Sequence, residues 1–491
     1  MSEKRNNIWL AAHYILTMVA SLVSLKFNLM NFGSETFGIW VLISSIWGLS
    51  NVVDLGFGLA LIRAVSKERD NPITLSKVTS TGFVFFFLFG FVILAIGLLV
   101  GNLYYIENPS LINNQIKLTA TNTNFLLGIF FYINYISTFF RSVYEGLGKF
   151  VFYSKIAMIY SLLTLLAAFF SWLFALDIAG LALLMLSAAA IQLFLLAVFS
   201  KSTSALTGFK PSNFNLTIFK ELFSFSIGVQ GATILGTAVD PVLKYIIGSG
   251  LNVSFVGYYD IAKRFSQASS GLFFAAFRTI YPKAARIEKE EEKTFLLNEV
   301  LSLSRKGILY GGLVFMAASP LFAAIFIYFY ASPLSYNIFL LLTLVESVNL
   351  FGYSYYSMLM GTGEAKFLAL VQLINLIGVA VFLFIGIRLT DSYMGIAGYS
   401  LTIILGNFLM LSWLKRSIDF SRFHYLMHAG GIKLIAQFAI ICAAFISLFS
   451  FDLDPFITAF GLSAAWLLLF GSNIKNYSEI LMNLLKPAKQ G

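Results

Sequence analysis

The stretch FVFFFLFGFVILAIGLLV at residues 83–100 decides the fold class of this chain. It contains no charged side chain, and its apolar residues form one continuous run. About 20 such residues, coiled as an α-helix, cross the roughly 30 Å of hydrocarbon in a bilayer. A strand of a membrane barrel would instead alternate apolar and polar residues over segments of about ten. The run LLTLLAAFFSWLFAL at 162–176 has the same character, so both stretches predict membrane-spanning helices.

The composition extends this prediction to the whole chain of 491 residues. Hydrophobic residues make up 58% of it and charged residues only 11%, whereas a soluble domain carries about 25% charged residues. So few charges cannot cover a surface that faces water. In lipid, moreover, the backbone must satisfy its own hydrogen bonds. We therefore predict an all-α, polytopic integral membrane protein.

Recurring apolar runs predict about fourteen transmembrane helices. The first run, from Ile8, is too long for the core of a signal peptide, so we interpret it as a retained helix. We expect the helices near residues 8–30, 37–62, 80–101, 121–141, 151–175, 178–199, 218–247, 256–281, 302–330, 336–360, 366–388, 394–414, 432–451 and 456–472.

An internal repeat relates the two halves of the chain. FGIWVL at 37–42 corresponds to VGYYDI at 256–261, and IAGLAL at 178–183 corresponds to IAGYSL at 396–401. The loop GLGKF at 146–150 is echoed by GTG at 361–363, with a Lys-Phe pair just after it. Six helices return the chain to its starting side. The repeats are therefore predicted to be parallel, related by an axis along the membrane normal.

This repeat predicts the domain organisation. We expect a six-helix lobe at 1–200, a cytoplasmic linker at 201–217 and a second six-helix lobe at 218–415. Two extra transmembrane helices at 432–472 and a cytoplasmic tail at 473–491 would follow. Two pseudo-symmetric bundles around a central cleft are typical of transporters that work by alternating access.

The net charge of +10 is distributed by side of the membrane. Basic residues gather in alternate loops, such as those around Lys67 and Lys283, while the opposite loops hold Lys117 and, at their margin, Arg388. The positive-inside rule then places both termini in the cytoplasm. The charge is thus explained by topology and by anionic inner-leaflet lipid, and it does not indicate nucleic-acid binding.

Ionisable residues inside predicted helices are candidates for function, because each costs at least about 2.5–3.5 kcal/mol to insert. They concentrate in the first two helices of each repeat. The basic candidates for substrate binding are Lys26, Lys244, Arg264, Lys263, Arg63 and Arg141. The acidic candidates, as charge partners or ion-coupling groups, are Asp54, Asp240, Asp260 and Glu346.

Simpler interpretations stay open for several of these residues. Asp240 and Lys244 are four residues apart and would neutralise each other. Arg63 and Arg141 lie near the cytoplasmic interface and would only snorkel to it. If instead Lys26 and Lys244, which occupy related places in the two repeats, face a common cleft, they form a two-sided basic cavity suited to a diphosphate. Arg264 would add bidentate phosphate contacts.

Other residues are less informative. Pro241 removes a backbone hydrogen bond from its helix and is a candidate hinge, or else a tolerated kink. His13 is alone in the first helix, and the single cysteine, Cys442, excludes an internal disulfide. We find no metal, nucleophile or nucleotide-binding motif and predict no cofactor, with coupling to membrane potential, H⁺ or Na⁺ left open.

The order of these features resembles the bacterial Wzx-type polysaccharide flippases, which translocate O-antigen and capsule units and belong to the multidrug/oligosaccharidyl-lipid/polysaccharide (MOP) superfamily. The matching stretches are ETFGIWVL at 35–42, VDLGFGLALIRAVSK at 53–67, RSVYEGLGKF at 141–150 and VGYYDIAKRFSQ at 256–267. The resemblance implies an inner-membrane protein, not an enzyme. It would move undecaprenyl-diphosphate-linked oligosaccharide from the cytoplasmic to the periplasmic leaflet. Membrane lipids and other polysaccharide assembly proteins would be its partners.

The resemblance also implies basic residues in helices 1, 2 and 8, where Lys26 and Arg264 fill two positions. Helix 2 departs from the pattern, because it offers Asp54 within the span and Arg63 only at its end. Two alternatives remain. A drug or cation antiporter of the same superfamily would need an acidic cavity. A membrane-embedded glycan polymerase or ligase would be expected to have a large external loop, and the external loops here are short.

Overall fold

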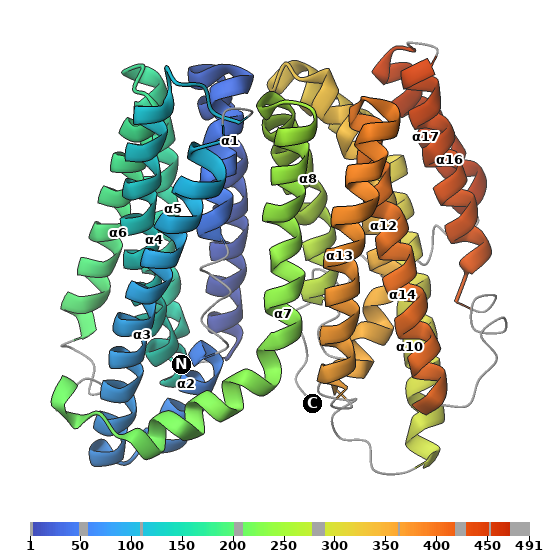
Figure 1. Cartoon of the computed structure of the whole chain (residues 1–491). Helices are drawn as coiled ribbons and strands as arrows, with labels where there is room; N and C mark the ends of the chain where they lie inside the picture. Colours follow the sequence, from blue (N-terminus) through green and yellow to red (C-terminus); the bar gives the residue numbers. More distant parts are fainter. Residues whose placement is uncertain are drawn as a thin grey trace. The chain divides into compact units, whose positions relative to one another are not determined.

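The structure, a computed structural model, describes residues 3–48, 57–108, 111–200, 210–276, 290–361, 364–417, 429–450 and 453–471. All regular secondary structure in these ranges is helical (Figure 1). The chain divides into two compact units, Met1–Gly257 and Tyr258–Gly491.

The first unit contains the helices of the first repeat together with the one that follows them. Its elements are α1 (Glu3–Gly48), α2 (Phe57–Glu68), α3 (Pro72–Val100), the π-helix η2 (Gly101–Ile106), α4 (Lys117–Gly146), α5 (Phe150–Leu173), α6 (Ile178–Ser200), the short η4 (Pro211–Asn213) and α7 (Leu216–Gly250). Helix α7 packs on α1, α2 and α3 within this unit.

The second unit begins within α8 (Val253–Ala276). Its further elements are α10 (Glu290–Gly311), the π-helix η5 (Gly312–Ala317), α11 (Ser319–Ala324), the π-helix η6 (Ile325–Phe329), α12 (Pro333–Gly361), α13 (Ala365–Thr390), η7 (Tyr393–Ile396), α14 (Ala397–Ser417), α16 (Gly431–Ser450) and α17 (Pro455–Phe470). Helix α12 contacts α10, α13, α14 and α16 and thus forms the centre of this unit.

The helix boundary predicted between residues 30 and 37 is present, because α1 consists of two helices that meet at Gly33, whose φ of 68° and ψ of −179° are non-helical and suit glycine. The span predicted at 302–330 differs from the structure and is interrupted, since Pro320 cannot donate a helical hydrogen bond. Helix α10 ends before it, and the chain passes through η5 and η6 on either side of α11.

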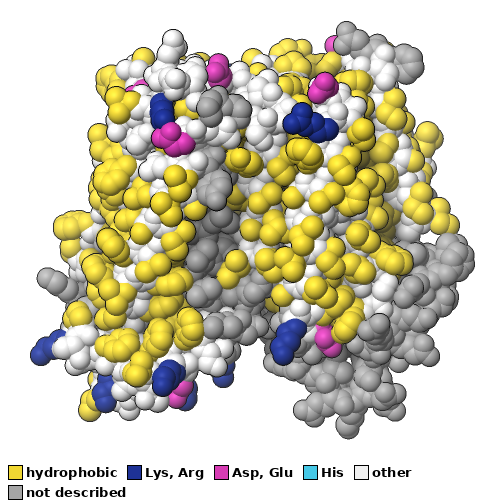
Figure 2. All heavy atoms as spheres, in the orientation of Figure 1, with side chains coloured by type: hydrophobic (Ala, Val, Ile, Leu, Met, Phe, Trp, Pro, Cys, Tyr) yellow, Lys and Arg dark blue, Asp and Glu magenta, His cyan; other side chains and the backbone are white. Residues whose placement is uncertain are grey.

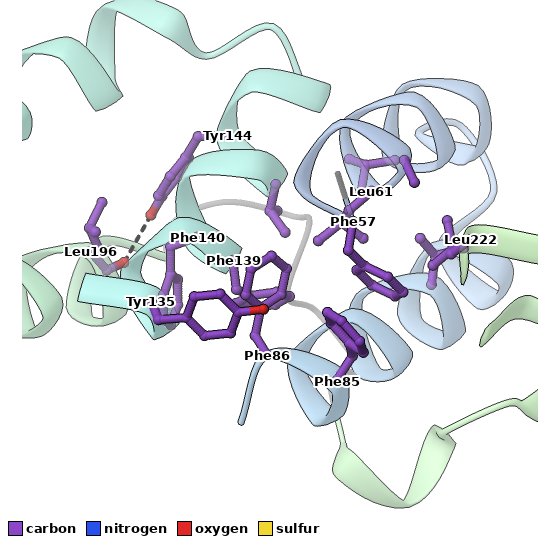
Figure 3. Packing of buried hydrophobic residues seen from close by; sticks show 14 of the residues in the cluster. Phe57, Leu61, Phe85, Phe86, Tyr135, Phe139, Phe140, Tyr144, Leu196 and Leu222 are labelled. Atoms are coloured by element: carbon purple, nitrogen blue, oxygen red, sulfur yellow. Dashed lines mark hydrogen bonds between the residues drawn. The ribbon is translucent and has the colours of Figure 1, made fainter. Parts of the chain in front are cut away.

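A hydrophobic core holds α2, α3, α4 and α7 together in the first unit (Figure 3). The ring of Phe57 stacks on Phe85 with centroids 3.8 Å apart, and Phe85 lies beside Phe86, which reaches Tyr135 of α4. The same core extends to α6, because the Tyr144 hydroxyl donates to the Leu196 carbonyl oxygen at 3.0 Å. Closely packed aromatic rings of this kind stabilise the unit by direct contact. The hydrophobic effect does not drive helices together in lipid, because lipid tails are as apolar as the side chains.

Glycines at corresponding places in the two repeats meet inside the first unit. A Cβ added to Gly38 of α1 would overlap the Val253 carbonyl oxygen in the first turn of α8. A Cβ added to Gly257 would lie 2.9 Å from the Phe37 ring and 3.4 Å from the Gly38 nitrogen. Helix backbones approach this closely only through small residues, which explains why the repeated motif carries glycine at both places.

In the second unit, a hydroxyl satisfies backbone carbonyls next to a π-helix. Ser463 of α17 lies 3.2 and 3.0 Å from the carbonyl oxygens of Met316 and Ala317, at the end of η5. A polar backbone group left open in lipid would cost several kcal/mol. Helix α16 is attached through Gln437, whose Nε2 donates to the Ser347 hydroxyl at 3.0 Å. The two last helices are therefore integral to the packing of this unit.

Ten helices within the described residues are long and apolar enough to span a membrane, and Ser319–Phe329 and Pro455–Phe470 are shorter apolar helices. On the face shown in Figure 2, hydrophobic side chains cover the middle of the helices, and charged side chains gather at their ends. Large apolar side chains are exposed along α3, among them Leu88, Phe91 and Leu99. The chain is a multi-pass membrane protein, and the predicted all-α polytopic fold class is confirmed.

Candidate functional site

The basic residue of α7 lies in an ion pair with an acidic neighbour. Lys244 Nζ is 3.0 Å from Asp240 Oδ2, one turn earlier in the same helix. The lysine side chain is only 7% exposed, while the aspartate is 29% exposed. The neutralisation that the sequence left open is therefore present. Pro241 lies between the two residues and is buried, and α7 runs through it without ending.

Helix α8 carries a second pair with the opposite pattern of burial. Arg264 Nε donates to Asp260 Oδ2 at 2.8 Å. Here the carboxylate is 4% exposed and the arginine side chain 40%. The neighbouring Lys263 lies with its Nζ 5.6 Å from the centre of the Tyr259 ring, a cation–π contact. The Asp260–Arg264 pair was not predicted, although it has the same i, i+4 spacing as Asp240 and Lys244.

A third pair of the same spacing closes α4. Arg141 Nε donates to Glu145 Oε1 at 2.8 Å, with the arginine side chain 48% exposed and the carboxylate 14% exposed. The guanidinium carbon also lies 5.6 Å from the centre of the Tyr153 ring on α5. Arg141 is thus held by two neighbouring side chains, whereas an arginine that only snorkels to the interface needs none.

The two remaining basic candidates lie on less enclosed surfaces of the first unit. Lys26 is half-buried on α1, on the helical stripe that also carries the exposed side chains of Ile15, Val19 and Met30. Arg63 is exposed on α2. Asp54, the acidic candidate beside it in the sequence, lies outside the described residues.

Glu346 of α12 lies in a polar environment within the second unit. Its carboxylate lies near the side chains of Ser270, Asn349 and Lys263. This arrangement joins α8 and α12 around one acidic group. Within the described residues, no three His, Cys, Asp or Glu side chains are placed to hold a metal ion.

One group of polar residues was not anticipated from the sequence. His13 was interpreted as isolated in α1, but its Nδ1 lies 3.3 Å from the Thr17 hydroxyl, and its ring lies 6.3 Å from that of Tyr153. Thr17 in turn lies 2.7 Å from the Ser161 hydroxyl of α5. The sequence did carry one sign of a polar contact between α4 and α5. Polar residues recur seven positions apart, and so on one helix face, at Asn134 and Arg141 on α4 and at Tyr153 and Tyr160 on α5.

The fold agrees with that of solved MOP superfamily transporters. An inward-facing multidrug resistance MATE family transporter of that superfamily superposes with a TM-score of 0.60, at 14% identity over 85% of this chain and 95% of that chain. The lipid II flippase MurJ, in an inward closed conformation, gives the same TM-score at 15% identity, over 95% of this chain and 99% of that chain.

Sequence comparison gives a more specific result. A Shigella flexneri protein described as a "Putative O-antigen transporter" is 24% identical over 431 residues, covering 84% of this chain and 98% of that protein. The model of the family described as "Polysaccharide biosynthesis protein" matches residues 4–288, more than half of the chain. The predicted resemblance is confirmed: this chain belongs to the polysaccharide biosynthesis protein family and has the fold of MOP superfamily transporters, not that of an enzyme.

Proposed function

We propose that this protein flips undecaprenyl-diphosphate-linked oligosaccharide units from the cytoplasmic to the periplasmic leaflet of a bacterial inner membrane. The observation that carries the proposal is a set of ion pairs in α7 and α8, two helices that the sequence predicts to span the membrane, in a polysaccharide biosynthesis protein. The S. flexneri relative, described as an O-antigen transporter, supports this choice of cargo. The units would serve O-antigen, capsule or exopolysaccharide assembly, and both termini would be cytoplasmic.

In this proposal, residues 1–200 and 218–415 act as two lobes that expose a binding site alternately to either side. Pro241 serves as a hinge in α7. The cargo's diphosphate is negative, and the cytoplasm is the negative side of the membrane. Outward movement is therefore favoured by about 2.3 kcal/mol per charge per 100 mV. Asp54, Asp240, Asp260 and Glu346 remain the candidates for coupling to H⁺ or Na⁺.

The ion pairs suit a carrier that must exist both empty and loaded. A cation in low dielectric without a partner would cost several kcal/mol, so each resting pair lowers the cost of the empty state. Each carboxylate lies on the same helix as its cation. A diphosphate oxygen would take the place of the carboxylate on Lys244 or Arg264 and form charge-assisted hydrogen bonds.

The fold alone does not decide between a flippase and a drug antiporter, because the MATE transporter and MurJ superpose equally well. The family match supports the flippase, since it names polysaccharide biosynthesis. The i, i+4 pairs add to this, because each offers a cation that an anionic head group can use.

The experiment is deletion of the gene, followed by extraction of lipid-linked intermediates and measurement of surface glycan. We expect complete repeat units to accumulate in the cytoplasmic leaflet, surface glycan to disappear, and the wild-type gene to restore it. Drug sensitivity is measured in parallel. Unchanged glycan together with increased drug sensitivity would overturn the proposal in favour of an antiporter.

A further inference from the structure

Three helices of the first unit bring polar and aromatic side chains together near the start of α1, the end of α4 and the start of α5. Arg141 and Glu145 come from α4, Tyr153 from α5 and His13 from α1. Arg141 bonds Glu145 at 2.8 Å, and the Tyr153 ring lies 5.6 Å from the guanidinium and 6.3 Å from the imidazole, at 79° to the latter. We call these four residues the α1–α4–α5 cluster.

Hydrogen-bond directions fix the tautomer of His13. The Ser161 hydroxyl donates to the Ala157 carbonyl oxygen at 3.0 Å, so it accepts from Thr17 at 2.7 Å. The Thr17 proton is then used, and its oxygen must accept from His13 Nδ1 at 3.3 Å. A neutral imidazole with its proton on Nδ1 presents Nε2 as an acceptor. No hydrogen bond to Nε2 is formed among the described residues.

The cluster keeps further hydrogen-bonding capacity. Arg141 uses Nε for Glu145, and within the described part of the chain its two terminal nitrogens make no hydrogen bond. Its side chain is 48% exposed and therefore accessible. The cluster thus offers donors from Arg141, acceptors from Glu145 and His13, and the partly exposed ring of Tyr153.

The charge of the cluster decides what kind of ligand it suits. The positive charge of Arg141 and the negative charge of Glu145 cancel, and His13 in this tautomer is neutral. A neutral sugar has an apolar face that packs on an aromatic ring and hydroxyl groups that both donate and accept, so it needs no net charge in its site.

We propose that the α1–α4–α5 cluster is a subsite that binds a neutral sugar residue of the oligosaccharide, apart from the cations that bind the diphosphate. The inference rests on the proposed function, because it takes the cargo to be a lipid-linked oligosaccharide. In this inference Arg141 binds a sugar hydroxyl and not a phosphate, and Glu145 binds the sugar beside it.

The test is calorimetric titration of the full-length protein in lipid nanodiscs with two separate probes. One probe is the repeat-unit oligosaccharide of the producing strain, released from lipid and phosphate, and the other is inorganic diphosphate. We expect Arg141→Ala and Tyr153→Ala to weaken oligosaccharide binding by about tenfold or more, the loss typical of one charge-assisted hydrogen bond or stacking contact. Both variants should bind diphosphate within about twofold of wild type.

Two controls separate recognition from loss of folding. Tyr153→Phe keeps the ring and should retain oligosaccharide binding. Arg69→Ala removes an exposed arginine, paired with Asp70 at the end of α2, and should leave the binding of both probes unchanged. Equal oligosaccharide binding by wild type and both alanine variants would overturn the subsite. Loss of diphosphate binding in Arg141→Ala, alongside the loss of oligosaccharide binding, would also overturn it, because Arg141 would then be a ligand of the diphosphate.

The same experiment distinguishes this inference from the proposed function. Wild-type protein that binds diphosphate but not the oligosaccharide would refute the sugar subsite and leave the flippase proposal intact. Binding of neither probe, together with unchanged lipid-linked intermediates in the deletion strain, would refute both.

Discussion

The ion pairs of α7 and α8 have the same spacing but opposite burial. In α7 the cation, Lys244, is enclosed and its carboxylate is partly open, whereas in α8 the carboxylate, Asp260, is enclosed and Arg264 is partly open. The cost of breaking a pair depends on which charge is left behind in low dielectric. The same substitution, aspartate to alanine, should therefore have very different effects in the two helices.

The largest effect is expected for Asp240→Ala. It leaves Lys244 buried without its carboxylate, and loss of one partner of a buried pair costs about 3–5 kcal/mol. We expect a marked fall in folded yield and in the free energy of unfolding, measured by denaturant titration in detergent. The double variant Asp240→Ala/Lys244→Met removes both charges and should recover most of the loss; failure to recover it would assign another role to Asp240.

A smaller effect is expected for Arg264→Ala. It leaves Asp260 enclosed, but this carboxyl group can take up a proton and keep its buried position as a neutral acid. We expect about 1–3 kcal/mol of destabilisation and loss of surface glycan, because a proposed phosphate ligand is gone. Arg264→Lys keeps the charge and should retain stability better than transport. Full surface glycan in the alanine variant would remove Arg264 from the binding site.

Asp260→Ala should be milder again. The residue left behind, Arg264, is 40% exposed and can reach water or lipid head groups. A partly exposed pair contributes about 1 kcal/mol or less. A shift in the thermal midpoint smaller than that of Asp240→Ala is the expected result. A shift as large as that of Asp240→Ala would show that burial of the remaining charge does not control the cost.

The smallest change in stability is expected for Glu145→Ala in α4. Arg141 is the most exposed of the three paired cations and keeps its contact with Tyr153. Helical i, i+4 pairs of this kind contribute about 0.3–0.5 kcal/mol. Thermal unfolding should therefore be close to wild type, while oligosaccharide binding weakens if the sugar subsite is correct. A large loss of stability would make Glu145 a structural residue.

Several features could be predicted from the sequence because they depend only on local chain geometry. A continuous apolar run such as 83–100 forms a spanning helix whatever its neighbours, because lipid leaves the backbone no other partner. The contact of Asp240 with Lys244 follows from helical spacing alone. The equivalence of Gly38 and Gly257 was visible as a repeat, although their mutual contact was not.

Other features required the tertiary structure, because they depend on which helices meet. The burial of Lys244 and the exposure of Arg264 are set by the neighbouring helices and leave no trace in the spacing of the residues. The sequence treated His13 as isolated, since Tyr153, whose ring it contacts, and Ser161, which bonds its neighbour Thr17, lie about 140 residues away on α5. The sequence by itself therefore determined the membrane class, the helices and the family. The packing of helices decided which charges are enclosed and which polar groups gather, since burial belongs to the assembled bundle and not to any one segment.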